Sequence, residues 1–273
     1  MKSQSYHLWQ KIGVATIMSI ALFSVNTKVT HAATITLPHG YTAKRIKHAS
    51  YHLTPSLART LAKVSRNGWK HNNYTASSYD NSRIVNVNKL TASEKNELAH
   101  FSLNTINNAR HQLKRESWHY SKAAMHFASR VAHNYYQDGT SCWSATHDVK
   151  AITKAAKASG LNYRLGQIYE DEAALPITTQ YHEQYRSMGA LKEQLYFNIK
   201  QMLFGNYSGT NVNDLSNYVE YEHAGDLLGC RIYNAKTKYF GQSFSLEKGN
   251  SSHISVHMLT VAKWCIQNYK KFK

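Results

Sequence analysis

The sequence predicts an α+β fold in which helices pack on a small antiparallel sheet at the C-terminal end. Three observations support this prediction. Helical periodicity dominates residues 90–204, strand-like alternation appears only after residue 230, and 42% of the residues are hydrophobic, which is enough for a real core. A length of 273 residues fits one domain with extensions, or two small domains.

The first 32 residues have the three parts of a secretory signal peptide. Lys2 and Lys11 are basic, residues 12–25 form an apolar run, and Thr30-His31-Ala32 resembles a small-residue cleavage site. A membrane anchor is the alternative, but spanning a bilayer takes about 20 apolar residues. We therefore predict a signal peptide at residues 1–32, a secreted or cell-surface protein, and no transmembrane segment after cleavage.

The charge of the chain is strongly basic, with 33 Lys+Arg against 16 Asp+Glu and a net charge of +17. Removing the three lysines of residues 1–32 lowers this to +14. For an exported protein, such a charge predicts anionic cell-wall polymers or lipid headgroups as partners, and no nucleic acid.

Three cysteines, Cys142, Cys230 and Cys265, leave at least one thiol unpaired. Export permits a disulfide, but free cysteine also packs as a small hydrophobic residue. The disulfide state is therefore left open.

Residues 33–88 are expected to form a polar N-terminal extension, because they are rich in Asn, Ser, Tyr, Lys and His. A short helix is predicted at residues 57–64, after Pro55. The Asn67-Gly68 pair is a turn signal at the start of the polar segment that follows. We expect this extension to pack loosely on the rest of the chain.

Five helices are expected next. The helix at residues 90–113 has an apolar stripe and a capping box formed by Thr91 and Glu94. The helix at residues 122–137 begins after Ser121 and ends at Gly139. Further helices are predicted at residues 147–159 and 189–204, with a short fifth helix containing His223.

Strands are predicted at residues 231–234, 239–246 and 253–261, and in the last of them apolar and polar residues alternate, except at Leu259. Residues 169–172 are expected in a loop. The core domain is predicted to span residues 89–262, followed by a basic C-terminal tail at residues 263–273.

Several segments resemble the CAP superfamily, which takes in the cysteine-rich secretory, antigen 5 and pathogenesis-related proteins. Residues 103–110 (LNTINNAR) resemble the Asn-x-x-Arg end of the first helix, and Tyr169-Glu170 sits where the family has Gly-Glu-Asn. Residues 222–228 (EHAGDLL) resemble the bacterial Gly-His-x-x-Asn-Ile-Leu motif. The resemblance covers roughly residues 55–262 and is closest to the surface-exclusion proteins of Gram-positive bacteria.

This resemblance implies an α-β-α sandwich with a cleft lined by two histidines and two acids. His147 and His223 match the histidine positions, and Glu170 matches one acid. Asn198 stands where the second acid is expected, which departs from the family pattern. Further candidates for the cleft are Glu172, Glu193 and Glu222.

The same residues suggest one cofactor, since His147, His223 and Glu170 could hold a divalent metal such as zinc. Two alternative functions are a metal-assisted hydrolase or protease, and lipid or sterol binding. The sequence contains neither a G-x-S-x-G nor an H-E-x-x-H motif. From the signal peptide, the charge of +14 after its removal and the incomplete acid set, we predict a secreted, non-catalytic protein of a Gram-positive surface that modulates adhesion or cell–cell contact.

Overall fold

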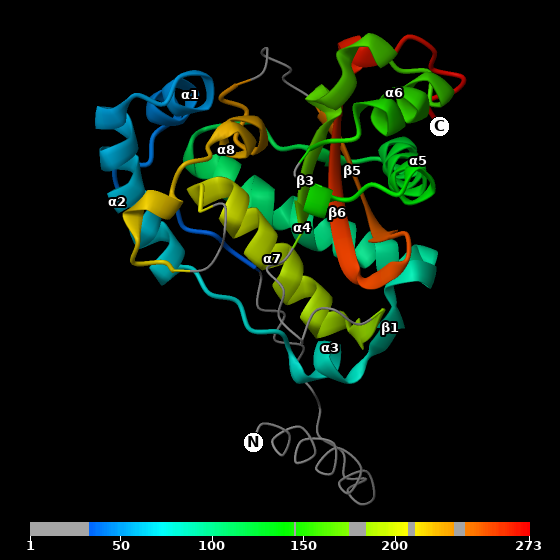
Figure 1. The fold of residues 1–273 in the computed structure, drawn as a ribbon, viewed down its shortest axis with the longest axis horizontal. Coiled ribbons are helices and arrows are strands. Elements are labelled where there is room, and N and C mark those ends of the chain that lie inside the picture. The colour runs from blue at the N-terminus through cyan, green and yellow to red at the C-terminus, as the bar shows by residue number, and fades with distance from the viewer. Residues whose placement is uncertain (1–32, 145, 175–183, 207–210, 232–237) are drawn as a thin grey trace, which may run out of the picture. The chain divides into compact units, whose positions relative to one another are not determined.

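A four-stranded sheet lies between two layers of helices in the computed structural model of the chain (Figure 1). The structure describes residues 33–144, 146–174, 184–206, 211–231 and 238–273. The helices and the sheet confirm the predicted α+β class, and the layers match the expected α-β-α sandwich.

The sheet has the strand order β2-β5-β6-β3. Strands β5 (Lys238–Glu247) and β6 (Asn250–Ala262) form its long antiparallel centre, and β3 (Glu170–Ala174) extends it beside β6. Strand β2 (His119–Tyr120) pairs in parallel with β5, so the sheet is mixed and not purely antiparallel as predicted. The strand expected at residues 231–234 lies outside the described residues, apart from Arg231.

The two faces of β6 belong to two different cores. Ile254, Val256 and Met258 join a larger core, whereas Leu259 and Val261 join a smaller one. Alternate residues of a strand point to opposite faces of the sheet, and this explains the two-residue period seen in the sequence.

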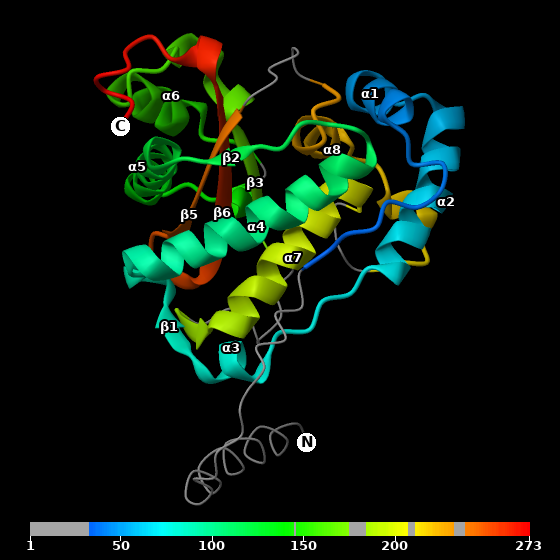
Figure 2. The same cartoon turned by 180° about the vertical axis from the view of Figure 1, so that it is seen from behind.

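The larger core lies under α4 (Ala92–Gln112), α7 (Met188–Phe204) and α8 (Glu222–Leu227). Figure 2 shows α4 lying across α7 on this side of the sheet. The smaller core lies under α5 (Lys122–Asp138) and α6 (Val149–Ala158) on the other face. Thr91 and Glu94 form the predicted capping box of α4, and Gly139 ends α5 in a left-handed conformation.

The N-terminal segment is an integral part of this unit, contrary to the loose extension expected for residues 33–88. It forms α1 (Ala43–Tyr51), α2 (Pro55–His71), α3 (Ser78–Ser82) and β1 (Ile84–Asn86), which pairs with β4 (Tyr185–Ser187). Its apolar side chains, including Ile46 and Leu61, are buried in the larger core. No boundary therefore separates this segment from the domain expected to begin at residue 89, and residues 32–273 form one compact unit.

The C-terminal residues 263–273 also pack on the domain and do not form a free tail. Cys265 is buried, and its carbonyl accepts a hydrogen bond from the backbone of Asn162. The ring of Phe272 lies 6.0 Å from that of Tyr239, between ring centroids.

Short 3-10 turns connect these elements at Val87–Lys89, Cys142–Ser144, Tyr163–Tyr169, Leu215–Asn217 and Lys263–Cys265. Cys142, Cys230 and Cys265 are all free thiols. Within the described ranges, no helix combines the length and apolar character needed to cross a bilayer.

Candidate functional site

One cleft of about 520 Å³ gathers most of the side chains expected at the site. Its walls come from the end of α1, the segment before α6, the strand β3 and the helix α8. The lining residues are Tyr51, Cys142, Thr146, His147, Gln167, Ile168, Glu170, Asp171, Glu172, Glu220, Glu222, His223, Asp226 and Arg231.

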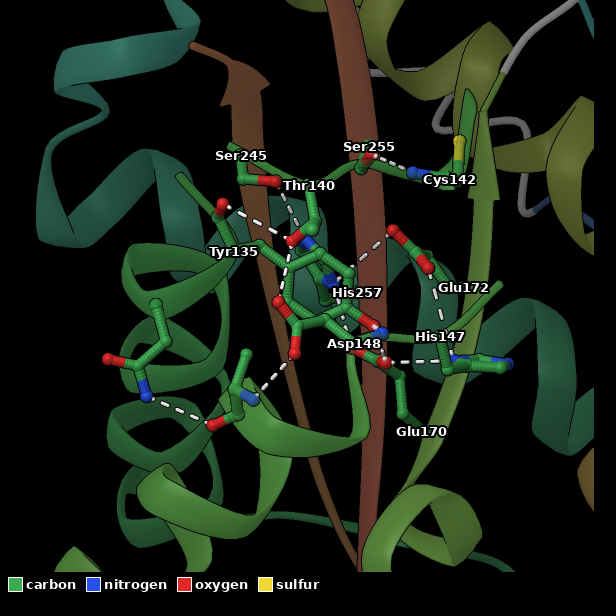
Figure 3. Close-up of polar contacts among 12 residues, drawn as sticks. Tyr135, Thr140, Cys142, His147, Asp148, Glu170, Glu172, Ser245, Ser255 and His257 are labelled. Carbon is green, nitrogen blue, oxygen red and sulfur yellow. Dashed lines mark hydrogen bonds and ion pairs between the residues drawn. The ribbon is translucent and has the colours of Figure 1, made fainter. Parts of the chain in front are cut away.

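His147 and Glu170 form the first ion pair of this cleft. His147 directly precedes Asp148, whose side chain caps α6, and this cap holds the histidine backbone in place. Glu170 is the first residue of β3, so the sheet and not a loop positions it. Nδ1 of His147 lies 2.9 Å from Oε2 of Glu170 (Figure 3).

Glu170 is the centre of a buried hydrogen-bond network. Its Oε1 accepts from Nδ1 of His257 at 2.7 Å, and its Oε2 also accepts from the Tyr135 hydroxyl at 2.6 Å. Nε2 of His257 in turn shares a hydrogen bond of 2.8 Å with the Ser245 hydroxyl (Figure 3). Burial alone would raise the pKa of Glu170, but the hydrogen bonds from His147 and His257 lower it to about 2. Glu170 is therefore ionised at neutral pH and fixed in orientation.

His223 and Glu220 form the second ion pair. Nδ1 of His223 lies 2.7 Å from Oε2 of Glu220, and Oε1 of Glu220 accepts from the backbone N–H groups of Glu222 and His223. Glu220, one residue before the N-cap Tyr221, thereby satisfies the first two backbone N–H groups of α8 and orients the ring at the same time. Burial would lower the pKa of His223, but the hydrogen bond and charge of Glu220 raise it to about 9.

The sequence interpretation missed His257 and Glu220. Glu220 stands three residues before His223, a spacing that lets a carboxylate cap the helix and reach the ring, so the local sequence contained a signal. His257 is placed beside Glu170 only by the pairing of β3 with β6, which joins residues far apart in the chain.

The other carboxyl groups of the cleft are crowded. Burial and the charge of Asp226 raise the pKa of Asp171 to about 7. Burial and the charge of Glu170 raise the pKa of Glu172 well above its usual value, and burial also raises that of Asp226. Among the described residues, Oε1 of Glu172 has no hydrogen-bond partner, although the residue is only 9% exposed.

Two of the predicted site residues lie elsewhere. Asn198 is completely buried within α7, and Glu193 of the same helix accepts a hydrogen bond from the backbone of Ala76. Neither residue lines the cleft. The carboxylate that pairs with the second histidine comes instead from Glu220, just before α8. The remaining candidates, Glu172 and Glu222, do line it.

The expected set of His147, His223 and Glu170 does not converge on one divalent ion in this arrangement. The rings of His147 and His223 have centroids 6.4 Å apart, whereas two imidazoles on one tetrahedral zinc would lie about 5.3 Å apart, from a Zn–N distance of ~2.1 Å. His223 is protonated at neutral pH because its pKa is about 9, and a protonated ring has no lone pair for a metal. His147, Glu170 and Glu172 form a different group, whose ligand atoms lie within 4.8 Å of one another, so these three residues could hold an ion.

The chain of Ser245, His257 and Glu170 has the residue types of a hydrolytic triad, but it is buried. His257 is fully buried and Ser245 is 5% exposed, so a substrate cannot reach the hydroxyl. Cys142 lines the cleft, and burial raises the pKa of its thiol, which keeps it in the unreactive protonated form. As placed, the network orients Glu170 and His147 and does not present a nucleophile.

Comparison with known proteins identifies the fold. No protein-family model and no curated protein matches the chain. Among solved structures, the chain is similar to the CAP domain of Enterococcal PrgA, with a TM-score of 0.65 and 23% sequence identity over 86% of this chain and 88% of that one. The chain therefore has the fold of a CAP domain, and the resemblance expected from the sequence is confirmed at the level of the fold.

Proposed function

We propose that this protein, with its CAP-domain fold, is a non-catalytic binding protein of a Gram-positive cell surface. It is secreted, attaches to anionic components of the envelope and modulates adhesion or cell–cell contact. The observation that carries the proposal is the net charge of +17, which remains +14 without residues 1–32. A protein of this charge is attracted to polyanions over distances of about one Debye length, roughly 10 Å at 0.1 M salt.

The cleft supports a binding role more than a catalytic one. Each of its two histidines directs Nδ1 at a carboxylate, and the pKa of His223, about 9, makes that ring a poor general base near neutral pH. Similarity to a CAP domain of an enterococcal protein is consistent with the surface-exclusion resemblance of the sequence.

The experiment is a binding assay with isolated Gram-positive cell walls. Residues 33–273 are purified, since they lie in one compact unit, and are mixed with walls at salt concentrations from 10 mM to 1 M. We expect binding at low salt that is lost at high salt, because the Debye length falls from about 30 Å to about 3 Å over this range. Walls stripped of anionic polymer serve as the control, and a protein that fails to bind intact walls at 10 mM salt rules out the proposal.

A second candidate is a hydrolase that uses the open face of the cleft. The hydrogen bond between His147 and Glu170 favours it, because a carboxylate that orients an imidazole is a common arrangement for a general base. The test compares a His147→Ala variant with the wild-type protein on wall peptides and on envelope proteins. Equal activity of the two proteins eliminates this site as a catalytic one.

A further inference from the structure

The segment that forms α1 and α2 carries positive charge and contains no acidic residue of its own. Residues 33–79 contain seven lysines and arginines and no aspartate or glutamate. Two adjoining grooves of about 570 and 600 Å³ open on the surface of this segment, and Arg45, His48 and Leu57 line both. Lys44 and Lys47 each line one of them and are exposed. We call this region the α1–α2 basic face.

Helix α2 extends the basic face along its length. Arg59, Lys63, Arg66 and Lys70 recur at intervals of four, three and four residues, so they lie on one side of the helix. The first, second and fourth are exposed and Arg66 is half-buried. The stripe is about 16 Å long at 1.5 Å per residue, which is longer than a single phosphate group can occupy. It suits a ligand with several phosphates in series.

The basic face and the cleft meet at Tyr51, the last residue of α1. Tyr51 lines both the cleft and the second groove, and its hydroxyl donates a hydrogen bond to the carbonyl of Arg231. Close packing of α1 on α8 holds this junction (Figure 1). A Cβ atom on Gly225 would lie only 2.7 Å from the side chain of Ser50, so the two helices are in direct contact.

The cleft on the other side of Tyr51 has the opposite charge. Six of the 16 acidic residues of the chain line it, against the two cations His223, which pairs with Glu220, and Arg231, which pairs with Glu222 and Asp226. Asp171 and Asp226 repel each other when ionised, as do Glu170 and Glu172, and a cation placed among them would reduce that repulsion. A primary ammonium has three N–H donors, and the buried Oε1 of Glu172 is an acceptor without a hydrogen-bond partner in the described part of the chain.

We propose that the ligand is a phosphodiester polymer of the cell wall that carries primary amines along its chain. Its phosphates lie along the α1–α2 basic face, and an ammonium group enters the cleft beside Tyr51. This inference rests on the proposed function and deepens it, since attachment by net charge alone needs neither a particular face nor an amine. A polymer satisfies both regions at once because its phosphates and amines are covalently adjacent.

The decisive experiment compares one polymer in two forms. Mild alkali removes ester-linked amino acids from a wall teichoic acid and leaves the phosphodiester chain intact, so the stripped polymer is more anionic. Attraction by net charge predicts that a basic protein binds the stripped form more tightly. The proposal predicts the reverse, by about tenfold, as for the loss of one hydrogen bond to a charged group. Calorimetry at one fixed low salt concentration measures both affinities.

Variants of the cleft test where the amine binds. Glu222→Gln removes a carboxylate that is 60% exposed and pairs with Arg231 at 2.8 Å, and Glu172→Gln replaces the buried carboxyl by a group of the same shape. Each is expected to remove most of the preference for the amine-bearing polymer. Asp138→Asn, at an exposed site on the end of α5, is the matched control and is expected to keep the preference.

Variants of the basic face test where the phosphates bind. Lys44→Gln/Lys47→Gln and Lys150→Gln/Lys154→Gln remove the same charge from exposed positions on α1 and α6 respectively. We expect the α1 pair to weaken binding of both polymer forms about tenfold and the α6 pair to weaken it by less than about twofold, since distant charges are screened.

The outcomes separate this inference from the proposed function. If neither polymer form binds, the proposed function fails as well. If both bind but the stripped form binds as tightly or more tightly, or if the α1 and α6 pairs weaken binding equally, only this inference is overturned. Full competition by vesicles containing phosphatidylethanolamine and phosphatidylglycerol would assign the face to lipid headgroups and would also overturn it.

Discussion

The charges of the α1–α2 basic face are exposed to water, whereas the central charge of the acidic cleft is buried. On the basic face, Lys44, Lys47 and Lys63 are exposed, and water screens their repulsion. In the cleft, the carboxylate of Glu170 is withdrawn from water and stays ionised because His147 and His257 donate hydrogen bonds to it. Exposed charges can thus gather by composition alone, whereas a buried charge requires partners supplied by other elements.

Loss of the central carboxylate should have the largest effect on the fold. Glu170→Ala leaves His257, His147 and the Tyr135 hydroxyl without their common acceptor, and we expect a loss of about 3–5 kcal/mol in the free energy of unfolding. Urea unfolding followed by circular dichroism measures it. Lys47→Ala on the basic face is the control, with an expected change within about 0.5 kcal/mol. A Glu170→Ala protein as stable as the wild type would show that the network does not hold the fold.

The boundary between the two regions should be the next most sensitive point. Gly225→Ala on α8 places a methyl group 2.7 Å from Ser50 of α1, so one helix must shift. We expect a loss of about 1–3 kcal/mol, as for overpacking in a core. Thermal unfolding measures this loss. No change in midpoint would mean that α1 and α8 can separate freely, and the fixed junction at Tyr51 would then be wrong.

The pH dependence of stability should reveal the pair His223 and Glu220. The pKa of His223 is raised to about 9 in the folded protein from its ordinary value of 6.5. The stabilisation is therefore fully present below about pH 6.5 and is lost as the pH rises through about 9. In Glu220→Gln we expect a lower pKa of His223 in an NMR titration and a flatter fall in stability between pH 7 and 10. An unchanged titration would exclude Glu220 as the cause.

The smallest expected effect is a gain in stability from a substitution on α2. Lys63 lies four residues after Arg59 and three before Arg66 on α2, so Lys63→Glu replaces repulsion by attraction. We expect the helix to gain about 0.5 kcal/mol, while binding to cell walls weakens. Unfolding and wall-binding assays on the same preparation test the expected gain in stability and the expected loss of binding. A destabilised variant would show that the basic stripe is held by contacts other than charge.

Most of the helices could be predicted from the sequence because their signals are local. The capping box of Thr91 and Glu94 and the stop at Gly139 act within a few residues, and the predicted ends of α4, α5 and α7 lie within two residues of those observed. The integration of α1 and α2 was missed because their polar composition hides a narrow buried stripe that includes Leu61 and Trp69.

The site residues also fall into those that local motifs predict and those that only tertiary contacts identify. His147, Glu170 and His223 could be named from motifs, and the structure places all three in one cleft. Asn198 and Glu193 could not be excluded, because only the packing of α7 shows that they point away from it. His257 reaches Glu170 through strand pairing between residues 87 positions apart, which no local pattern encodes.

The sequence by itself determined the total charge, the absence of acids from residues 33–79, and the helical and strand periods, since these depend on composition and near neighbours. Only the tertiary structure decided that six acids gather in one cleft and that this cleft adjoins the basic face at Tyr51. The physical reason is that pKa shifts and ion pairs depend on burial and on distances of a few ångströms, and chain folding alone sets these between distant residues.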